Sequence, residues 1–94
     1  MLNEMHSATI VMDEFIKSQS LVTRQAARDL FWKISEMTES NITLDFSRIQ
    51  YSSRAFFDEL NHLQNELELS GRHIELQNLN QNLASLFQIV RSRS

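Results

Sequence analysis

The sequence predicts an α/β domain in which three amphipathic helices cover a small, mostly parallel or mixed sheet. Three short runs with strand-like patterns each precede a segment with helical spacing, in the order β-α-β-α-β-α. Helical segments between strands favour parallel pairing with right-handed crossovers, because an antiparallel hairpin needs only a few connecting residues. A chain of 94 residues has room for one hydrophobic core, so residues 1–94 are expected to form a single domain.

The first strand is predicted at residues 8–12, where β-branched side chains stand in a short apolar run. Residues 13–16 could extend or bend this strand, and residues 17–20 make a polar connection. Thr23 is then the expected N-cap of the first helix. Side chains at spacings of three, four and seven give this helix one apolar face: Ala27, Leu30, Phe31, Ile34 and Met37.

The second strand is predicted at residues 42–46, where apolar and polar side chains alternate. Ser52 or Ser53 offers an N-cap for the second helix, which should end near Gly71. The apolar stripe of this helix is Phe56, Leu60, Leu63 and Leu67, widened by Phe57.

Residues 73–76 alternate again and predict a third strand. Asn78 or Asn80 can cap the last helix, whose apolar face is Leu83, Leu86, Phe87 and Val90. A sheet of about three strands has unpaired edges, and one-sided helices leave its other face open to water or to a partner. A homodimer through an edge or a face is therefore one expected arrangement.

The composition argues against several function classes. Without cysteine the chain has no thiolate nucleophile or thiolate metal site, and one glycine without proline gives no glycine-rich phosphate loop. The histidines His6, His62 and His73 are scattered, and Asp58 with His62 supplies only two ligands, so we expect no metal and no cofactor. We find no constellation for nucleophilic catalysis and expect a protein that is not an enzyme.

Charge and hydropathy bound the location and the partners. The net charge of −3 argues against nucleic acid as a partner. No apolar stretch approaches the ~20 residues of a membrane span, and the first residues do not read as a secretory signal. Cytoplasm is the expected location.

Three ordered motifs carry a resemblance to a known family. Residues 44–60 run from Leu-Asp-Phe to Phe-Phe-Asp-Glu-Leu, residues 23–27 read Thr-Arg-Gln-Ala-Ala, and residues 78–80 read Asn-Leu-Asn. Together they resemble the STAS superfamily of sulphate transporters and anti-sigma factor antagonists, and most closely its bacterial STAS-like subgroup of unassigned function. The resemblance covers residues 21–90, about three quarters of the chain.

The resemblance implies a regulatory module that docks onto a protein partner, such as a histidine-kinase-type ATPase. In anti-sigma factor antagonists, an Asp-Ser-Ser-Gly turn at the start of the second helix carries the phosphorylated serine. Alignment on Asp45 places Arg54 at that acceptor position, with Ser53 before it. Ser52 and Ser53 remain as neighbouring hydroxyls and are the candidates for phosphorylation.

The expected docking surface combines this helix start with the first helix: Ser52, Ser53, Arg54, Asp58, Glu59, Arg24, Arg28 and Trp32. Simpler roles compete for some of these residues. Ser53 would serve as a helix cap, and Asp58 and Glu59 would be solvated acids near a helix start.

Trp32 lies away from the apolar face of its helix, so we expect it to be partly exposed. Arg24, Arg28 and Trp32 follow at intervals of four, which would let a guanidinium stack on the indole. Exposed tryptophan beside arginine is typical of interface hot spots. Alternatively, Trp32 packs under the N-terminal segment or a loop.

A second function class also fits the pattern. The cleft between the strand end at residues 44–46 and the helix start at Ser53 could hold an anionic metabolite or a lipid headgroup. Helix N-termini at the carboxyl ends of parallel strands suit anions.

Overall fold

A computed structural model describes residues 7–16, 20–21 and 23–92. His6, most of the polar connection at residues 17–20 and the segment proposed to cover Trp32 lie outside these residues. The elements, in chain order, are β1 (Ser7–Val11), α1 (Met12–Ile16), β2 (Ser20–Leu21), α2 (Arg24–Ser35), β3 (Asn41–Asp45), β4 (Tyr51–Ser52), α3 (Arg54–Leu69), β5 (His73–Gln77) and α4 (Gln81–Ser92).

The three predicted strands form one parallel sheet in the order β1-β3-β5. Their register aligns Ser7 with Asn41 and Asn41 with His73, so the three strands start level with one another. The parallel pairing predicted from the crossover lengths is confirmed. β3 takes the centre because the long connections carry the chain in sequence across the sheet from one edge to the other.

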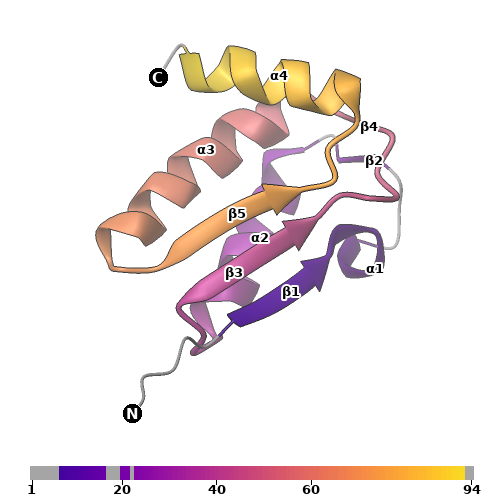
Figure 1. Ribbon diagram of the computed structural model, residues 1–94. Helices are drawn as coiled ribbons and strands as arrows, with labels where there is room; N and C mark the ends of the chain where they lie inside the picture. Colours follow the sequence, from indigo (N-terminus) through magenta and orange to yellow (C-terminus); the bar gives the residue numbers. More distant parts are fainter. Residues whose placement is uncertain (1–6, 17–19, 22, 93–94) are drawn as a thin grey trace.

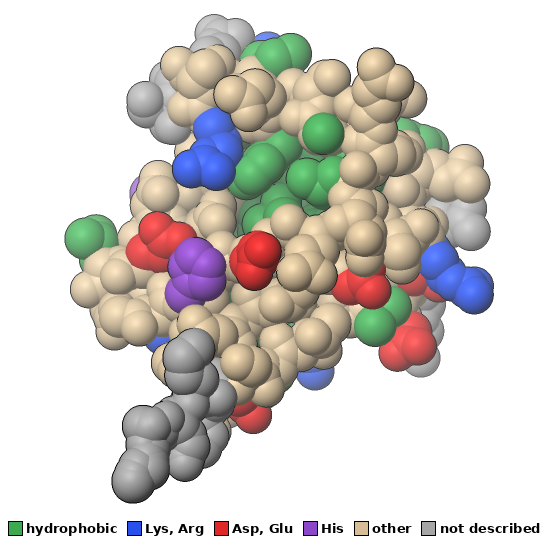
Figure 2. Space-filling model, viewed as in Figure 1, with side chains coloured by type: hydrophobic (Ala, Val, Ile, Leu, Met, Phe, Trp, Pro, Cys, Tyr) green, Lys and Arg blue, Asp and Glu red, His purple; other side chains and the backbone are tan. Residues whose placement is uncertain are grey.

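The sheet has one apolar face and one polar face. Ile10, Leu44 and Ile74 are buried on the side of the helices, whereas Thr9 and Glu75 are exposed on the other side. In Figure 1, α2 passes behind the strands and α3 runs alongside β5, while no helix covers the near face. Figure 2 shows mainly backbone and side chains that are not hydrophobic over the strands on this near face, with hydrophobic side chains visible nearer α4.

The prediction of three helices was wrong, because the described residues contain four. Residues 12–16 neither continue the first strand nor bend it; they form α1, with Asp13 and Glu14 in its first turn. Met12, the first residue of α1, is fully buried in the core. Acidic residues near a helix N-terminus stabilise the helix through their interaction with its dipole. This interaction favours a helical turn at residues 12–16 over a longer strand.

A second, two-stranded ladder was also missed. β2 and β4 pair in parallel over only two residues each, Ser20 with Tyr51 and Leu21 with Ser52. Two residues are too few to produce an alternating pattern, so no periodicity signals such a pair. The ladder ties the chain before α2 to the chain before α3 and places the starts of these two helices near each other.

The helix boundaries follow the capping signals. Thr23 Oγ1 accepts a hydrogen bond from the backbone N–H of Ala26 at 3.1 Å, and Ser53 Oγ accepts one from Phe56 at 3.1 Å. At α4 the cap is Asn80, whose Oδ1 accepts from the N–H of Leu83 at 2.8 Å. Each bond satisfies one of the donors that a helix start leaves open.

Gly71 ends α3 as predicted. Its φ of 95° lies in the left-handed region, and its N–H donates to the carbonyl of Glu68 at 3.1 Å. An L side chain is strained at this φ, so glycine fits the position best.

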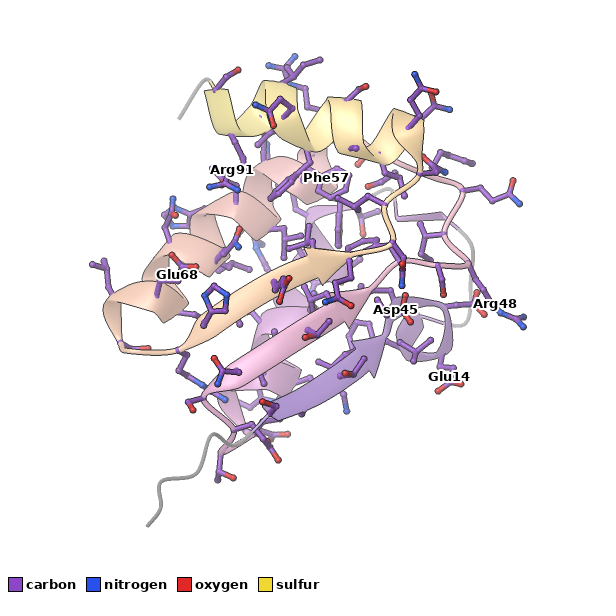
Figure 3. All side chains as sticks on the ribbon, viewed as in Figure 1. Glu14, Asp45, Arg48, Phe57, Glu68 and Arg91 are labelled. Atoms are coloured by element: carbon purple, nitrogen blue, oxygen red, sulfur yellow. The ribbon has the colours of Figure 1, made fainter. Side chains whose placement is uncertain are left out.

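An aromatic cluster joins the sheet to α3 and α4. The Phe57 ring centroid lies 6.1 Å from Phe46, 5.5 Å from Phe56 and 5.4 Å from Phe87. Phe46, Phe56 and Phe57 are fully buried. Figure 3 labels Phe57 below α4, and its ring contacts join α3 to α4 and to the segment after β3. Within the described residues, no helix is long and apolar enough to cross a membrane.

Candidate functional site

An ion-pair cluster joins the outer sides of α2 and α3. Arg24 Nη1 lies 3.3 Å from Glu59 Oε1, and Arg28 Nε lies 3.4 Å from Glu59 Oε2. Arg24 and Arg28 are one turn apart on α2, so both guanidiniums reach the same carboxylate on α3. Glu59 keeps only 15% of its side chain exposed, so it is not the solvated acid that its place in the sequence favoured.

Trp32 stands on the same helix as the two arginines and is 67% exposed. The predicted exposure is therefore confirmed. The predicted stacking of guanidinium on indole is not the arrangement present, because Arg24 and Arg28 are engaged with Glu59. In the part of the chain that the structure describes, the cation–π contact is that of Arg91, 5.5 Å from the Phe87 ring centroid.

The turn into α3 places its two serines differently. Ser53 Oγ caps α3, whereas Ser52 Oγ donates to the backbone carbonyl of Ser53 at 3.2 Å. Both serines are half-buried, and Arg54, which follows them, is exposed. Asp58, one turn further along α3, is half-buried. The structure thus brings Ser52, Ser53 and Arg54 together at one helix start, and the ladder between β2 and β4 holds this start near that of α2.

A polar network that the sequence did not suggest lies at the carboxyl ends of β3 and β5. Asn78 Nδ2 donates to Asp45 Oδ1 at 2.9 Å, and the N–H of Ser47 donates to the same oxygen at 3.0 Å. These bonds to Asn78 and Ser47 hold the pKa of Asp45 below its ordinary value, because they stabilise the ionised carboxylate. In the same connection, Asn80 Nδ2 donates to the carbonyl of Gln50 at 2.9 Å.

Next to this network is a hollow of about 500 Å³. Its lining is mainly polar: Phe46, Ser47, Arg48, Ile49, Gln50, Asn78, Asn80 and Asn82. The sequence predicted a cleft at these strand ends beside Ser53, but the residues that line this hollow come from the loop after β3, from the connection between β5 and α4, and from the first turn of α4. Spacing within the sequence could not reveal this, because the two segments are about 30 residues apart.

The histidines within the described residues stand near acids on the surface. His62 Nε2 lies 3.0 Å from Glu66 Oε2 along α3, and His73 Nδ1 lies 3.8 Å from Glu68 Oε2. Across residues 7–16, 20–21 and 23–92, no group of three or more His, Cys, Asp or Glu side chains is arranged to hold a metal ion.

Comparisons with models of protein families, with curated proteins and with solved structures found no match to this chain. The STAS resemblance therefore rests on the three sequence motifs alone. Of these, residues 23–27 begin at the cap of α2, residues 44–60 run from β3 into α3, and residues 78–80 connect β5 to α4.

Proposed function

We propose that this chain is a non-catalytic interaction module that docks onto another protein through α2 and the start of α3. The observation that carries the proposal is the exposure of Trp32, 67% of which faces solvent beside a pair of arginines. A large aromatic side chain that remains in water contributes little to the stability of its own fold. Its burial against a partner stabilises a complex, and tryptophan and arginine are enriched where binding energy concentrates.

The ion pairs of Glu59 support this docking surface by ordering it before binding. Arg24 and Arg28 are tethered to α3, so less side-chain freedom is lost when a partner covers them. Both side chains are more than half exposed, which leaves donors available for a partner carboxylate.

The proposed partner is a histidine-kinase-type ATPase or another signalling protein. This choice is supported by the resemblance of residues 23–27 and 44–60 to STAS motifs. Ser52 and Ser53 are the proposed phosphorylation sites, since a phosphate at a helix N-terminus is favoured by the helix dipole and Arg54 stands beside it. Phosphopeptide mass spectrometry of the protein from native cells tests this, and unmodified peptides under all growth conditions would contradict it.

The docking surface is tested by affinity capture from a native lysate, followed by calorimetric titration of the captured protein. Trp32→Ala should weaken binding at least tenfold, as expected for a hot-spot aromatic, while the melting temperature stays nearly unchanged. Leu69→Ala and Ile89→Ala are matched controls, because both side chains are exposed and apolar but lie on α3 and α4. Unchanged binding by Trp32→Ala, or a collapsed fold, would contradict the proposal.

The hollow at the strand ends favours a second candidate function, the binding of a small anionic ligand. The carboxyl ends of parallel strands are a common location for ligands, and Arg48 with three asparagines lines this hollow. NMR titration with inorganic phosphate tests it. Shifts confined to residues 46–50 and 78–82, and lost in Arg48→Ala, support the second candidate, whereas the first predicts no saturable shifts there.

A further inference from the structure

Asn61 of α3 is a nearly buried amide that the fold leaves without a hydrogen bond. Only 6% of the residue is exposed, and no hydrogen bond within the described residues engages its side chain. Every fully buried side-chain nitrogen and oxygen in the described part of the chain has a hydrogen-bond partner. The small surface that Asn61 keeps must therefore include its amide, which has lost most of its water without gaining a bond in return.

Helical spacing places Asn61 on the side of α3 that faces α4 and β5. It follows Phe57 by four residues and precedes Gln64 by three, so these side chains share one side of the helix. The Phe57 ring centroid lies 5.4 Å from that of Phe87 in α4, and Gln64 Nε2 donates to the carbonyl of Ile74 in β5 at 2.9 Å. The structure describes α3, β5 and α4 over their full lengths, so the surroundings of Asn61 are known.

Apolar side chains remain uncovered between β5 and α4. Ile10, Leu44 and Leu76 align across the three strands, but only the first two are buried, whereas Leu76 on β5 is half-buried. Leu79 and Leu86, in the connection to α4 and in α4 itself, are half-buried as well. Figure 2 shows hydrophobic side chains at the surface between α4 and the strands. We call Leu76, Leu79 and Leu86 the β5–α4 surface.

The backbone of Leu76 adds a second donor and acceptor to this surface. The carbonyl of Gln77 accepts from the N–H of Phe46 at 3.0 Å, so Gln77 bonds toward β3. Backbone groups alternate in direction along a strand, so the N–H and C=O of Leu76 point away from β3, at the outer edge of β5. Gln64 occupies the carbonyl of Ile74 on this edge, whereas nothing among the described residues bonds to these groups of Leu76.

A peptide backbone is the chemical complement of these groups. The side chain of Asn61 and the main chain of Leu76 each present a donor beside an acceptor, and another amide satisfies both at once. A fatty-acid carboxylate only accepts, so it would leave both oxygens without a donor. An extended peptide also directs alternate side chains to one face, where apolar ones would cover Leu79 and Leu86.

Arg91 adds a positive charge at the end of α4. It is exposed and one turn beyond Phe87, with its guanidinium carbon 5.5 Å from the Phe87 ring centroid. Figure 3 labels Arg91 between α4 and α3. A guanidinium donates in several directions, so it can bind a carboxylate while it stays over the ring. The charge of Arg91 thus complements an acidic residue in a segment bound to the β5–α4 surface.

We propose that the β5–α4 surface binds an extended apolar segment of a partner protein that carries an acidic residue at one end. A backbone amide of the segment pairs with Asn61, its main chain bonds to Leu76, and its acid meets Arg91. Glu59 places the proposed docking surface on the α2 side of α3, whereas Asn61 faces α4. The two sites are therefore separate, and each proposal can fail without the other.

Selection of short random peptides displayed on phage against the full chain tests the proposal. We expect enrichment of sequences with alternating apolar residues and an acidic residue at one end. Titration of a selected synthetic peptide into the isotope-labelled chain should then give saturable NMR shifts at the Asn61 side-chain amide, at Leu76 and at Leu86. Asn61→Leu should weaken binding roughly tenfold and also raise the melting temperature, because it removes a buried amide that has no bond within the fold.

Asn65→Leu is the matched control, since it removes the same amide one turn further along α3 at an exposed position. It should change neither the binding nor the melting temperature. Arg91→Glu should weaken binding, and circular dichroism shows whether each variant is folded.

Three outcomes would overturn the proposal. The first is a selection that enriches no peptide, or peptides whose shifts lie on α2. The second is a lower melting temperature in Asn61→Leu, which would mean that the amide serves the fold itself. The third is saturable binding of decanoate, and not of peptides, at Asn61, which would make this a fatty-acid site.

Discussion

Asn78 has a backbone conformation that is uncommon for residues other than glycine. Its φ of 61° is in the left-handed region, where it is the one residue other than glycine within the described residues. Asparagine tolerates this conformation better than most side chains. Here it also turns Nδ2 toward Asp45, so the strained backbone and the hydrogen bond support each other.

Two substitutions at Asn78 separate the backbone from the side chain. Asn78→Gly keeps access to the positive φ and loses only the bond to Asp45, whereas Asn78→Ala loses both. We expect Asn78→Ala to lower the free energy of unfolding by about 1–2 kcal/mol more than Asn78→Gly, the usual cost of left-handed backbone. Urea unfolding measures both. Equal losses would show that the backbone conformation adds no strain.

Asp45 predicts a dependence of stability on pH. Its pKa is lowered from 3.8, mainly by the hydrogen bond from Asn78, so the folded state favours the carboxylate. The stability that this provides is fully present above the unfolded pKa of about 3.9 and is lost as the pH falls through the lower folded pKa. Unfolding midpoints measured from pH 6 down to pH 2 should decline less steeply in Asp45→Asn than in the wild type. An identical slope would contradict this assignment.

Among the elements, α3 depends on its cap and on its contacts with α2. It supplies buried side chains to the core, Glu59 to the arginines of α2, and Gln64 to the edge of β5. One helix therefore links the docking surface, the sheet edge and the core. Its first turn, which carries Ser53, is part of the proposed docking surface, so its order matters for binding as well as for stability.

Removal of the α3 cap should affect stability moderately. Ser53→Ala leaves the Phe56 N–H without its acceptor and should cost about 1 kcal/mol. Ser53→Asp should retain most of this stability, because aspartate caps equally well and its charge suits the helix dipole. Thermal unfolding compares the two. Equal losses in both variants would show that the hydroxyl has another role.

At the scale of the whole molecule, the aromatic cluster around Phe57 determines whether the layers stay together. Its ring lies against side chains from the segment after β3, from α3 and from α4. Helices cover only one face of the sheet, so the core lies between that face and the helices, and the aromatic cluster is part of it. The exposed face contributes β-sheet hydrogen bonds but little buried apolar area.

Phe57→Ala should therefore destabilise the whole domain rather than one element. We expect a loss of about 3–5 kcal/mol, typical of a buried phenylalanine, and a large share of the total stability of a small domain. Leu69→Ala, at a side chain 89% exposed, should change the free energy by less than about 0.5 kcal/mol. Loss of α4 alone, with the rest of the amide protection intact in hydrogen exchange, would contradict a single cooperative core.

Much of the fold could be predicted because its signals are local. Spacings of three and four residues located the buried faces of α2, α3 and α4. A short apolar run with β-branched residues located β1, and alternation located β3 and β5, each to within one residue. Caps act over three residues, so Thr23 could be read directly. The choice between Ser52 and Ser53 was open until the structure showed Ser53 as the cap, and the choice between Asn78 and Asn80 depended on which side chain Asp45 engages. The exposure of Trp32 followed from the same helical geometry.

The sequence by itself determined the type and order of the main elements, their apolar faces and the absence of thiol chemistry. Tertiary structure alone decided that Arg24 and Arg28 meet Glu59, 35 and 31 residues away, and that Asp45 meets Asn78 across 33 residues. It also decided that Gln64 of α3 donates to the backbone carbonyl of Ile74 in the edge strand β5. The physical reason is range: helical and strand periodicities arise between neighbours in the chain, whereas these contacts exist only after packing brings distant segments together.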